Sequence, residues 1–147
     1  MIERIKQWLN STSEHDTPAL QEEVAVAALL SEVMLADGVA SEAEHQRLEQ
    51  LLARLFGHAP HEVHQWLQQG RAHQEEAVSL YEFTQHLKTL AIERREAILS
   101  ALWQMAMTDG VLDPQEEGIV RQVAELLYIP HSRFIQLKLR VENGSED

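Results

Sequence analysis

The chain has 147 residues, of which 44% are hydrophobic, so it is long enough to bury a core and too apolar to be disordered throughout. It contains no cysteine, which excludes disulfides, thiolate metal ligands and cysteine nucleophiles and suits a reducing compartment. Its net charge of −12 repels nucleic acid and anionic lipid. The composition therefore favours a protein that binds no nucleic acid and is compatible with cations or a basic protein partner.

The first seventeen residues predict an amphipathic helix over residues 1–10 and a polar linker over residues 11–17. This start lacks the apolar run and the small-residue cleavage site of a signal peptide. No stretch reaches the roughly 18 consecutive apolar residues of a membrane span. We therefore expect a cytoplasmic protein without a membrane span.

Apolar residues at spacings of three and four predict the next helices. The first of these runs from about Pro18 to Ala36. The second opens at Ser41, whose side chain and that of Glu44 have the spacing of a capping box, and it ends before a glycine. The third begins at Pro60, and a polar break follows it over residues 70–76.

The sequence of the second half of the chain predicts four more helices. A helix is expected over residues 79–89 and another over about residues 92–107. Asp113 caps the next helix, with Glu116 completing a second capping box, and a last helix follows Pro130. Because strand patterns are nearly absent, the sequence predicts one all-α domain of about seven to eight helices, with its core at about residues 18–140.

An internal repeat relates the two halves of the chain at a shift of 72 residues. The shift places Asp37-Gly38-Val39 on Asp109-Gly110-Val111, and it places Glu44 on Glu116. With a two-residue deletion the match continues to Pro60 and Pro130. We therefore expect two pseudo-symmetric three-helix repeats packed into one core.

The two Asp-Gly pairs differ in how readily their residues are explained. Glycine takes the left-handed conformation with which a helix commonly ends. The aspartate is disfavoured by about 0.3–1 kcal/mol next to the negative end of a helix dipole, so Asp37 and Asp109 each need a partner. That partner is either a backbone N–H in the first turn of the next helix or a divalent cation shared with Glu44 or Glu116.

Two other patterns in the sequence resemble metal sites. The Asp-Gly spacing resembles half of an EF-hand loop, but apolar residues such as Val33 and Met105 stand where its first ligand would be. His58, His61 and His64 could share an ion, yet their flanks match no zinc motif, which favours exposed, solvated histidines. No catalytic residues can be named from the sequence, and none of the patterns identifies a cofactor.

The two loops resemble the TerB family of tellurite-resistance-associated proteins, and also the TerB-like domain that precedes the J-domain in a membrane-anchored DnaJ-type co-chaperone. The resemblance covers about residues 18–140. It is carried by Leu30-Ser-Glu-Val-Met-Leu-Ala-Asp-Gly-Val-Ala-Ser-Glu-Ala-Glu44 and by Leu102-Trp-Gln-Met-Ala-Met-Thr-Asp-Gly-Val-Leu-Asp-Pro-Gln-Glu116. It implies an all-helical pseudo-symmetric fold with an acidic, metal-binding face.

Carried over to this sequence, the resemblance implies a set of metal ligands on both loops. Ser41 stands in the first loop where Asp113 stands in the second, so the first loop is the poorer site. The candidate ligands are Asp37, Glu44, Asp109 and Glu116, followed by Asp113 and Glu42.

The resulting hypothesis is a non-enzymatic domain in a stress-response or envelope-associated protein complex, whose acidic loops bind a divalent cation such as Ca²⁺, Mg²⁺ or Zn²⁺. The alternative is a pure interaction module whose acidic face meets a basic partner without metal. A metal-dependent hydrolase is the third reading, and it would need carboxylate clusters around a shared metal pair. The protein is expected to be a monomer or a weak homodimer.

Overall fold

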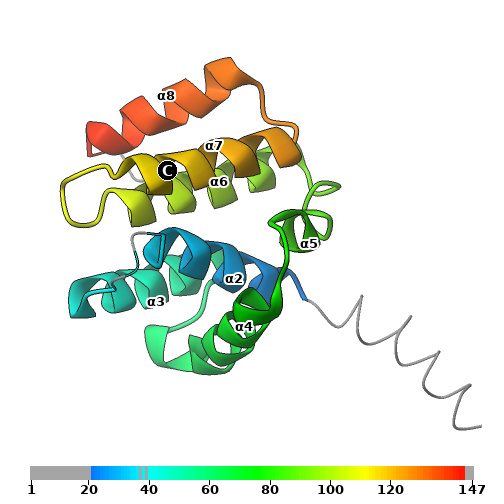
Figure 1. The fold of residues 1–147 in the computed structure, drawn as a ribbon, viewed down its shortest axis with the longest axis vertical. Helices are drawn as coiled ribbons and strands as arrows, with labels where there is room; N and C mark the ends of the chain where they lie inside the picture. The colour runs from blue at the N-terminus through cyan, green and yellow to red at the C-terminus, as the bar shows by residue number, and fades with distance from the viewer. Residues whose placement is uncertain (1–20, 37, 39, 145–147) are drawn as a thin grey trace, which may run out of the picture.

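The computed structural model describes residues 21–36, 38 and 40–144, and every regular element in them is a helix (Figure 1). The prediction of an all-α fold is confirmed. The predicted helix of residues 1–10 and the linker of residues 11–17 lie outside the described residues. The elements are α2 (Glu22–Met34), α3 (Glu42–Phe56), the 3₁₀ helix η2 (Pro60–Val63), α4 (His64–Glu76), α5 (Tyr81–Thr84), α6 (Ile92–Ala106), α7 (Pro114–Leu126) and α8 (His131–Glu142).

The helices form two units of the same order, α2–α3–α4 and α6–α7–α8, with α5 between them in the chain. Within each unit the first helix packs against the other two, and α2 also packs against α6 (Figure 1). Helix α2 is buried almost along its whole length, from Val24 to Ser31 and again at Val33 and Met34. Because α2 has little polar face, it is stable only when surrounded by other helices.

The turns after α2 and α6 have the same geometry. Gly38 and Gly110 have φ angles of 87° and 82°, in the left-handed region that favours glycine. The N–H of Gly38 donates to the Leu35 carbonyl at 2.9 Å, and the N–H of Gly110 donates to the Met107 carbonyl at 3.1 Å. The repeat seen in the sequence is therefore also a repeat of backbone structure.

The ends of α3 and α7 also have the same geometry, but the equivalent residues there are separated by one residue fewer than the 72-residue shift of the repeat. The N–H of His58 donates to the Ala53 carbonyl at 2.9 Å, and the N–H of Ile129 donates to the Ala124 carbonyl at the same distance. These bonds enclose a left-handed residue, which is Gly57 after α3 and Tyr128, with φ of 60°, after α7. One of the two residues missing from the second repeat is therefore missing at the end of α7.

Two predictions about the middle of the chain were wrong. Residues 70–76 form the second half of α4 instead of a break, because Gly70 packs against α2 while most of the polar side chains face solvent. The helix expected over residues 79–89 is limited to α5, and tight turns follow it, such as the bond from the Leu87 N–H to the Thr84 carbonyl. Three apolar residues of this stretch, Leu80, Phe83 and Leu87, are nevertheless buried.

An ion pair joins α8 to α6. Arg133 donates from Nε and from one terminal nitrogen to the Glu96 carboxylate, at 3.0 and 2.7 Å. The hydrogen bond from Arg133 lowers the pKa of Glu96 below its ordinary value of 4.5. The two-point geometry fixes the start of α8 against α6.

The closeness of α2 and α4 gives a first prediction. A Cβ atom on Gly70 would lie 2.7 Å from the Cβ of Ala27 and 2.9 Å from the backbone nitrogen of Ala28. Gly70→Ala should therefore lower the free energy of unfolding by about 1–3 kcal/mol, as overpacking does. Gly118→Ala is the matched control in the interior of α7, where a Cβ meets no atom within 4 Å, and it should raise stability by about 0.5–1 kcal/mol. Urea unfolding measures both, and equal effects would contradict the close contact.

A second prediction concerns pH. Because the pKa of Glu96 is lowered in the folded state, its contribution to stability is complete above pH 4.5 and is lost as the pH falls through the lower folded-state value. Glu96→Gln should therefore be less stable than the wild type at pH 7, and the difference should shrink below pH 4.5. Thermal unfolding between pH 7 and pH 3 measures it, and a constant difference would refute the assignment.

Candidate functional site

The two Asp-Gly loops lie at the same end of the molecule, because α2 and α6 both run toward that end and α3 and α7 both start from it (Figure 1). Of the first loop, the structure describes Ala36, Gly38 and Ala40 but neither Asp37 nor Val39. The second loop is described in full. The candidate ligands can therefore be placed in both units except for Asp37, which lies outside the described residues.

The predicted capping box is present at the start of α3, between Ser41, which precedes the helix, and Glu44. The N–H of Glu44 donates to the Ser41 hydroxyl at 3.1 Å, and the N–H of Ser41 donates to the Glu44 carboxylate at 2.8 Å. The Glu44 side chain is buried, with 5% exposed. Its carboxylate is thus engaged in closing the loop.

The second unit is capped differently from the prediction. Asp113 accepts a bond of 2.7 Å from the N–H of Gln115, one position earlier than the capping-box bond from Glu116 that was expected. Proline at the first position of the helix leaves the Gln115 N–H as the first available donor, and the short aspartate side chain reaches it. Glu116 is 2% exposed and makes an interaction of its own.

Asp109 has a backbone partner within its own loop. Its Oδ1 accepts a bond of 3.2 Å from the N–H of Val111, two residues on. This is an Asx turn, and it differs from the predicted bond to the first turn of the next helix because the donor precedes that helix. The bond gives the carboxylate a partner at the negative end of α6, and the side chain stays exposed.

The acidic candidates do not converge on one point in the described part of the chain. Glu42 is exposed at the start of α3, whereas Glu44 and Glu116 are buried at equivalent positions of the two units. Among the residues that the structure describes, no three histidine, aspartate or glutamate side chains are grouped so that they could hold a metal ion.

The histidines of the first unit are also dispersed. His58, His61 and His64 are all exposed, as predicted. His58 lies 3.4 Å from the Glu62 carboxylate, and His64 lies 3.8 Å from that of Glu49. These are surface contacts with carboxylates, and they account for two of the three side chains.

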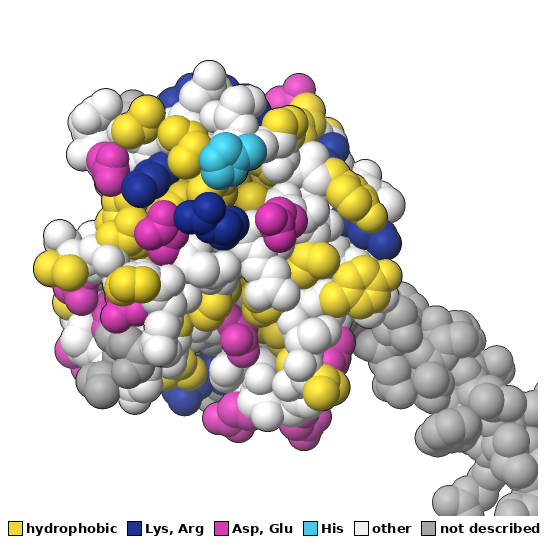
Figure 2. Space-filling model, turned by 45° about the horizontal axis from the view of Figure 1, so that its top comes forward, with side chains coloured by type: hydrophobic (Ala, Val, Ile, Leu, Met, Phe, Trp, Pro, Cys, Tyr) yellow, Lys and Arg dark blue, Asp and Glu magenta, His cyan; other side chains and the backbone are white. Residues whose placement is uncertain are grey.

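The end that carries the loops has an acidic surface with an apolar tip. On the face shown in Figure 2, acidic side chains lie at this end and also across the rest of the face. Val111 is 70% exposed between Asp109 and Asp113. Sequence reasoning used Val111 only as a match in the repeat, although an apolar residue between two loop aspartates was the available signal.

The role of Asp109 as a loop tie gives a third prediction. Asp109→Ala removes the acceptor for the Val111 N–H and should lower the free energy of unfolding by about 0.5–1 kcal/mol. Asp109→Asn keeps an oxygen at the same position and removes charge next to the helix end, so its stability should equal that of the wild type or slightly exceed it. Chemical unfolding measures both variants, and an asparagine variant as unstable as the alanine variant would contradict the tie.

Comparison with known proteins agrees with this architecture. A family model described as "Tellurite resistance protein TerB" matches residues 23–139, which include both Asp-Gly loops and reach from α2 into α8. No curated protein and no solved structure gives a significant match. Within the described residues, no helix has the length and apolar character needed to cross a membrane. The match spans most of the chain, which therefore belongs to the TerB family.

Proposed function

We propose that this TerB-family chain is a non-enzymatic protein-interaction domain, and that the end carrying the two Asp-Gly loops is an acidic contact surface for a basic partner. The observation that carries the proposal is the exposed Val111 side chain, held between two carboxylates that already accept backbone hydrogen bonds. Because the described loop is tied by its own side chains, it has a fixed shape before any partner arrives.

The composition of this surface fits a protein better than a small ion. A contact surface combines an apolar centre with a charged rim, and Val111 with its flanking aspartates has that arrangement. The net charge of −12 would speed association with a basic protein and keep nucleic acid away. We further propose that the partner belongs to a stress-response or envelope-associated complex.

A capture experiment with paired variants tests this proposal. Immobilised full-length protein should retain a basic partner from a host lysate at low salt, and Val111→Ser and Asp109→Asn should each reduce the captured amount several-fold. Val78→Ser is the control, because Val78 is 93% exposed but lies before α5, away from the loops. Capture that resists about 0.5 M salt, or that falls equally in the Val78 variant, would overturn the acidic contact surface.

A second candidate function is binding of a divalent cation by the same loops. Two buried carboxylates, Glu44 and Glu116, stand at equivalent positions near the end where both loops turn, although Glu44 already accepts the Ser41 N–H and Glu116 makes an interaction of its own. Carboxylate oxygens are the ligands that Ca²⁺ and Mg²⁺ prefer. In this version the ion would tune the contact surface.

Calorimetric titration with Ca²⁺, Mg²⁺, Mn²⁺ and Zn²⁺ separates the two candidates. A cation site should produce binding heat and a raised melting temperature, and Asp109→Asn should weaken both. If no ion gives heat or a change in melting temperature while partner capture persists, the loops act without metal.

A further inference from the structure

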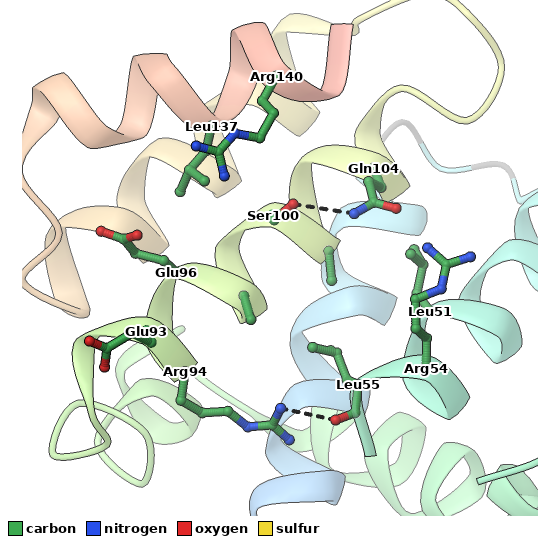
Figure 3. Close-up of a pocket in the computed structure, with 12 residues that line it drawn as sticks. Leu51, Arg54, Leu55, Glu93, Arg94, Glu96, Ser100, Gln104, Leu137 and Arg140 are labelled. Carbon is green, nitrogen blue, oxygen red and sulfur yellow. Dashed lines mark hydrogen bonds between the residues drawn. The ribbon is translucent and has the colours of Figure 1, made fainter. Parts of the chain in front are cut away.

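A second surface feature, separate from the Asp-Gly loops, is a groove that runs along α6. It has a volume of about 420 Å³ and lies between α3 of the first unit and α8 of the second (Figure 3). Its walls are largely apolar, with Leu51 and Leu55 on α3 and Leu137 on α8 facing Ala97 and Ala101 on α6. This volume falls in the range of sites that take a ligand or a few inserted side chains.

One end of the groove is polar and ordered. Ser100 and Gln104 are buried, with 2% and 6% exposed, and the Gln104 amide donates to the Ser100 hydroxyl at 3.2 Å. Arg47 of α3 donates to the Gln104 carbonyl oxygen at 2.9 Å. These bonds join α3 to α6 across the end of the groove, so its shape is set before a ligand enters.

The pseudo-symmetric counterpart of this groove is filled by the chain itself. The repeat relates α6, α3 and α8 to α2, α7 and α4, so the counterpart lies along α2 between α7 and α4. There α5 packs against both α2 and α7. The stretch before α5 and Glu32 of α2, which stands 72 residues before Gln104, border a remaining hollow of about 330 Å³, so the α5 segment fills the counterpart only in part.

The segment that fills the counterpart shows what such a groove accepts. Leu80, Phe83 and Leu87 are 8%, 2% and 0% exposed, and they follow one another at intervals of three and four residues. A short helix and the turns after it therefore bury three apolar side chains on one face. This is how amphipathic helices bind grooves between helices.

The two grooves differ because of one position in the last helix of each unit. In the first unit Gly70 lets α4 approach α2 until a Cβ would clash. The equivalent residue of α8 is Arg140, whose side chain points into the space between α8 and α6 (Figure 3). A long side chain therefore stands in the second unit at the position where glycine allows close packing in the first, and the groove beside it is open.

The rim of the open groove is basic in a strongly acidic protein. Arg54, Arg94 and Arg140 line it, and their equivalents in the filled groove are Leu126, Glu22 and Gly70. Glu93 and Glu96 also line the open groove; Glu96 is paired with Arg133, and Arg94 is paired with Glu22 at 2.8 Å, so the positive charge of the rim comes from Arg54 and Arg140. The charge of the rim therefore favours a ligand with acidic flanks.

From these observations we propose that the open groove binds a short amphipathic helix of a partner protein, with apolar residues at positions one, four and eight and acidic residues at its flanks. The apolar side chains would lie over Leu55 of α3 and Ala97 of α6, the partly exposed apolar residues of the groove, as those of the α5 segment lie in the counterpart. The acidic flanks would face Arg54 and Arg140. This site is separate from the acidic loops and takes a partner of the opposite charge.

The test uses the full-length protein and a synthetic peptide. The peptide carries Leu, Phe and Leu at positions one, four and eight with glutamates at both ends, and its affinity is measured by calorimetry. Ala97→Leu fills the groove and should weaken binding about tenfold or more, whereas Ala72→Leu on the exposed side of α4 should leave it unchanged. Arg54→Glu with Arg140→Glu should also weaken binding about tenfold, against no change for Arg71→Glu on α4.

Several results would overturn the proposal, provided that circular dichroism shows folded variants. These are an absence of binding, equal binding by a scrambled peptide, and equal loss in groove and control variants. Binding only after Ile2, Ile5 and Leu9 are replaced by serine would assign the groove to that segment of the chain. A dimer in sedimentation that Ala97→Leu dissociates would assign it to a second copy.

Discussion

The burial of α2 and α6 against each other constrains everything else in this molecule. Helix α2 is buried from Val24 to Ser31, and α6 is buried from Ile98 to Ala106, so these stretches are stable only when other helices surround them. Each unit therefore needs the other to complete its core. Since both helices point the same way, their Asp-Gly turns emerge at one end, and the remaining helices leave one groove on each side.

Divergence between the two units created the differences on which function can depend. Residues 22–76 contain ten acidic and three basic residues, whereas residues 92–144 contain eight and six. The added arginines include Arg94 and Arg140, which line the open groove. The first unit thus has more acidic residues and a groove occupied by α5. The second unit has more arginines and an open groove, beside the same central helices α2 and α6.

The sequence predicted those parts of the fold that depend on local pattern. Apolar spacing and end residues located α3 and α6, because caps and buried stripes are local. The second half of α4 was missed because its polarity resembles a loop, and its helical state depends on contact between Gly70 and α2. The groove was missed for a related reason, since its width depends on how far α8 stands from α6. Only the pairing of Gly70 with Arg140 in the repeat signals it.

The two surfaces differ in charge, and this difference bears on how they could be used. The loop end presents Asp109 and Asp113 around Val111, which suits a basic contact, whereas the groove presents arginines around leucines, which suits an acidic one. The bond between Arg47 and Gln104 separates them, because it closes the groove at the end nearest the loops. A single partner would need acidic residues along its helix and basic residues beyond it. Two partners of opposite charge would not need this combination in one chain. Each could therefore bind its own surface of the same core independently.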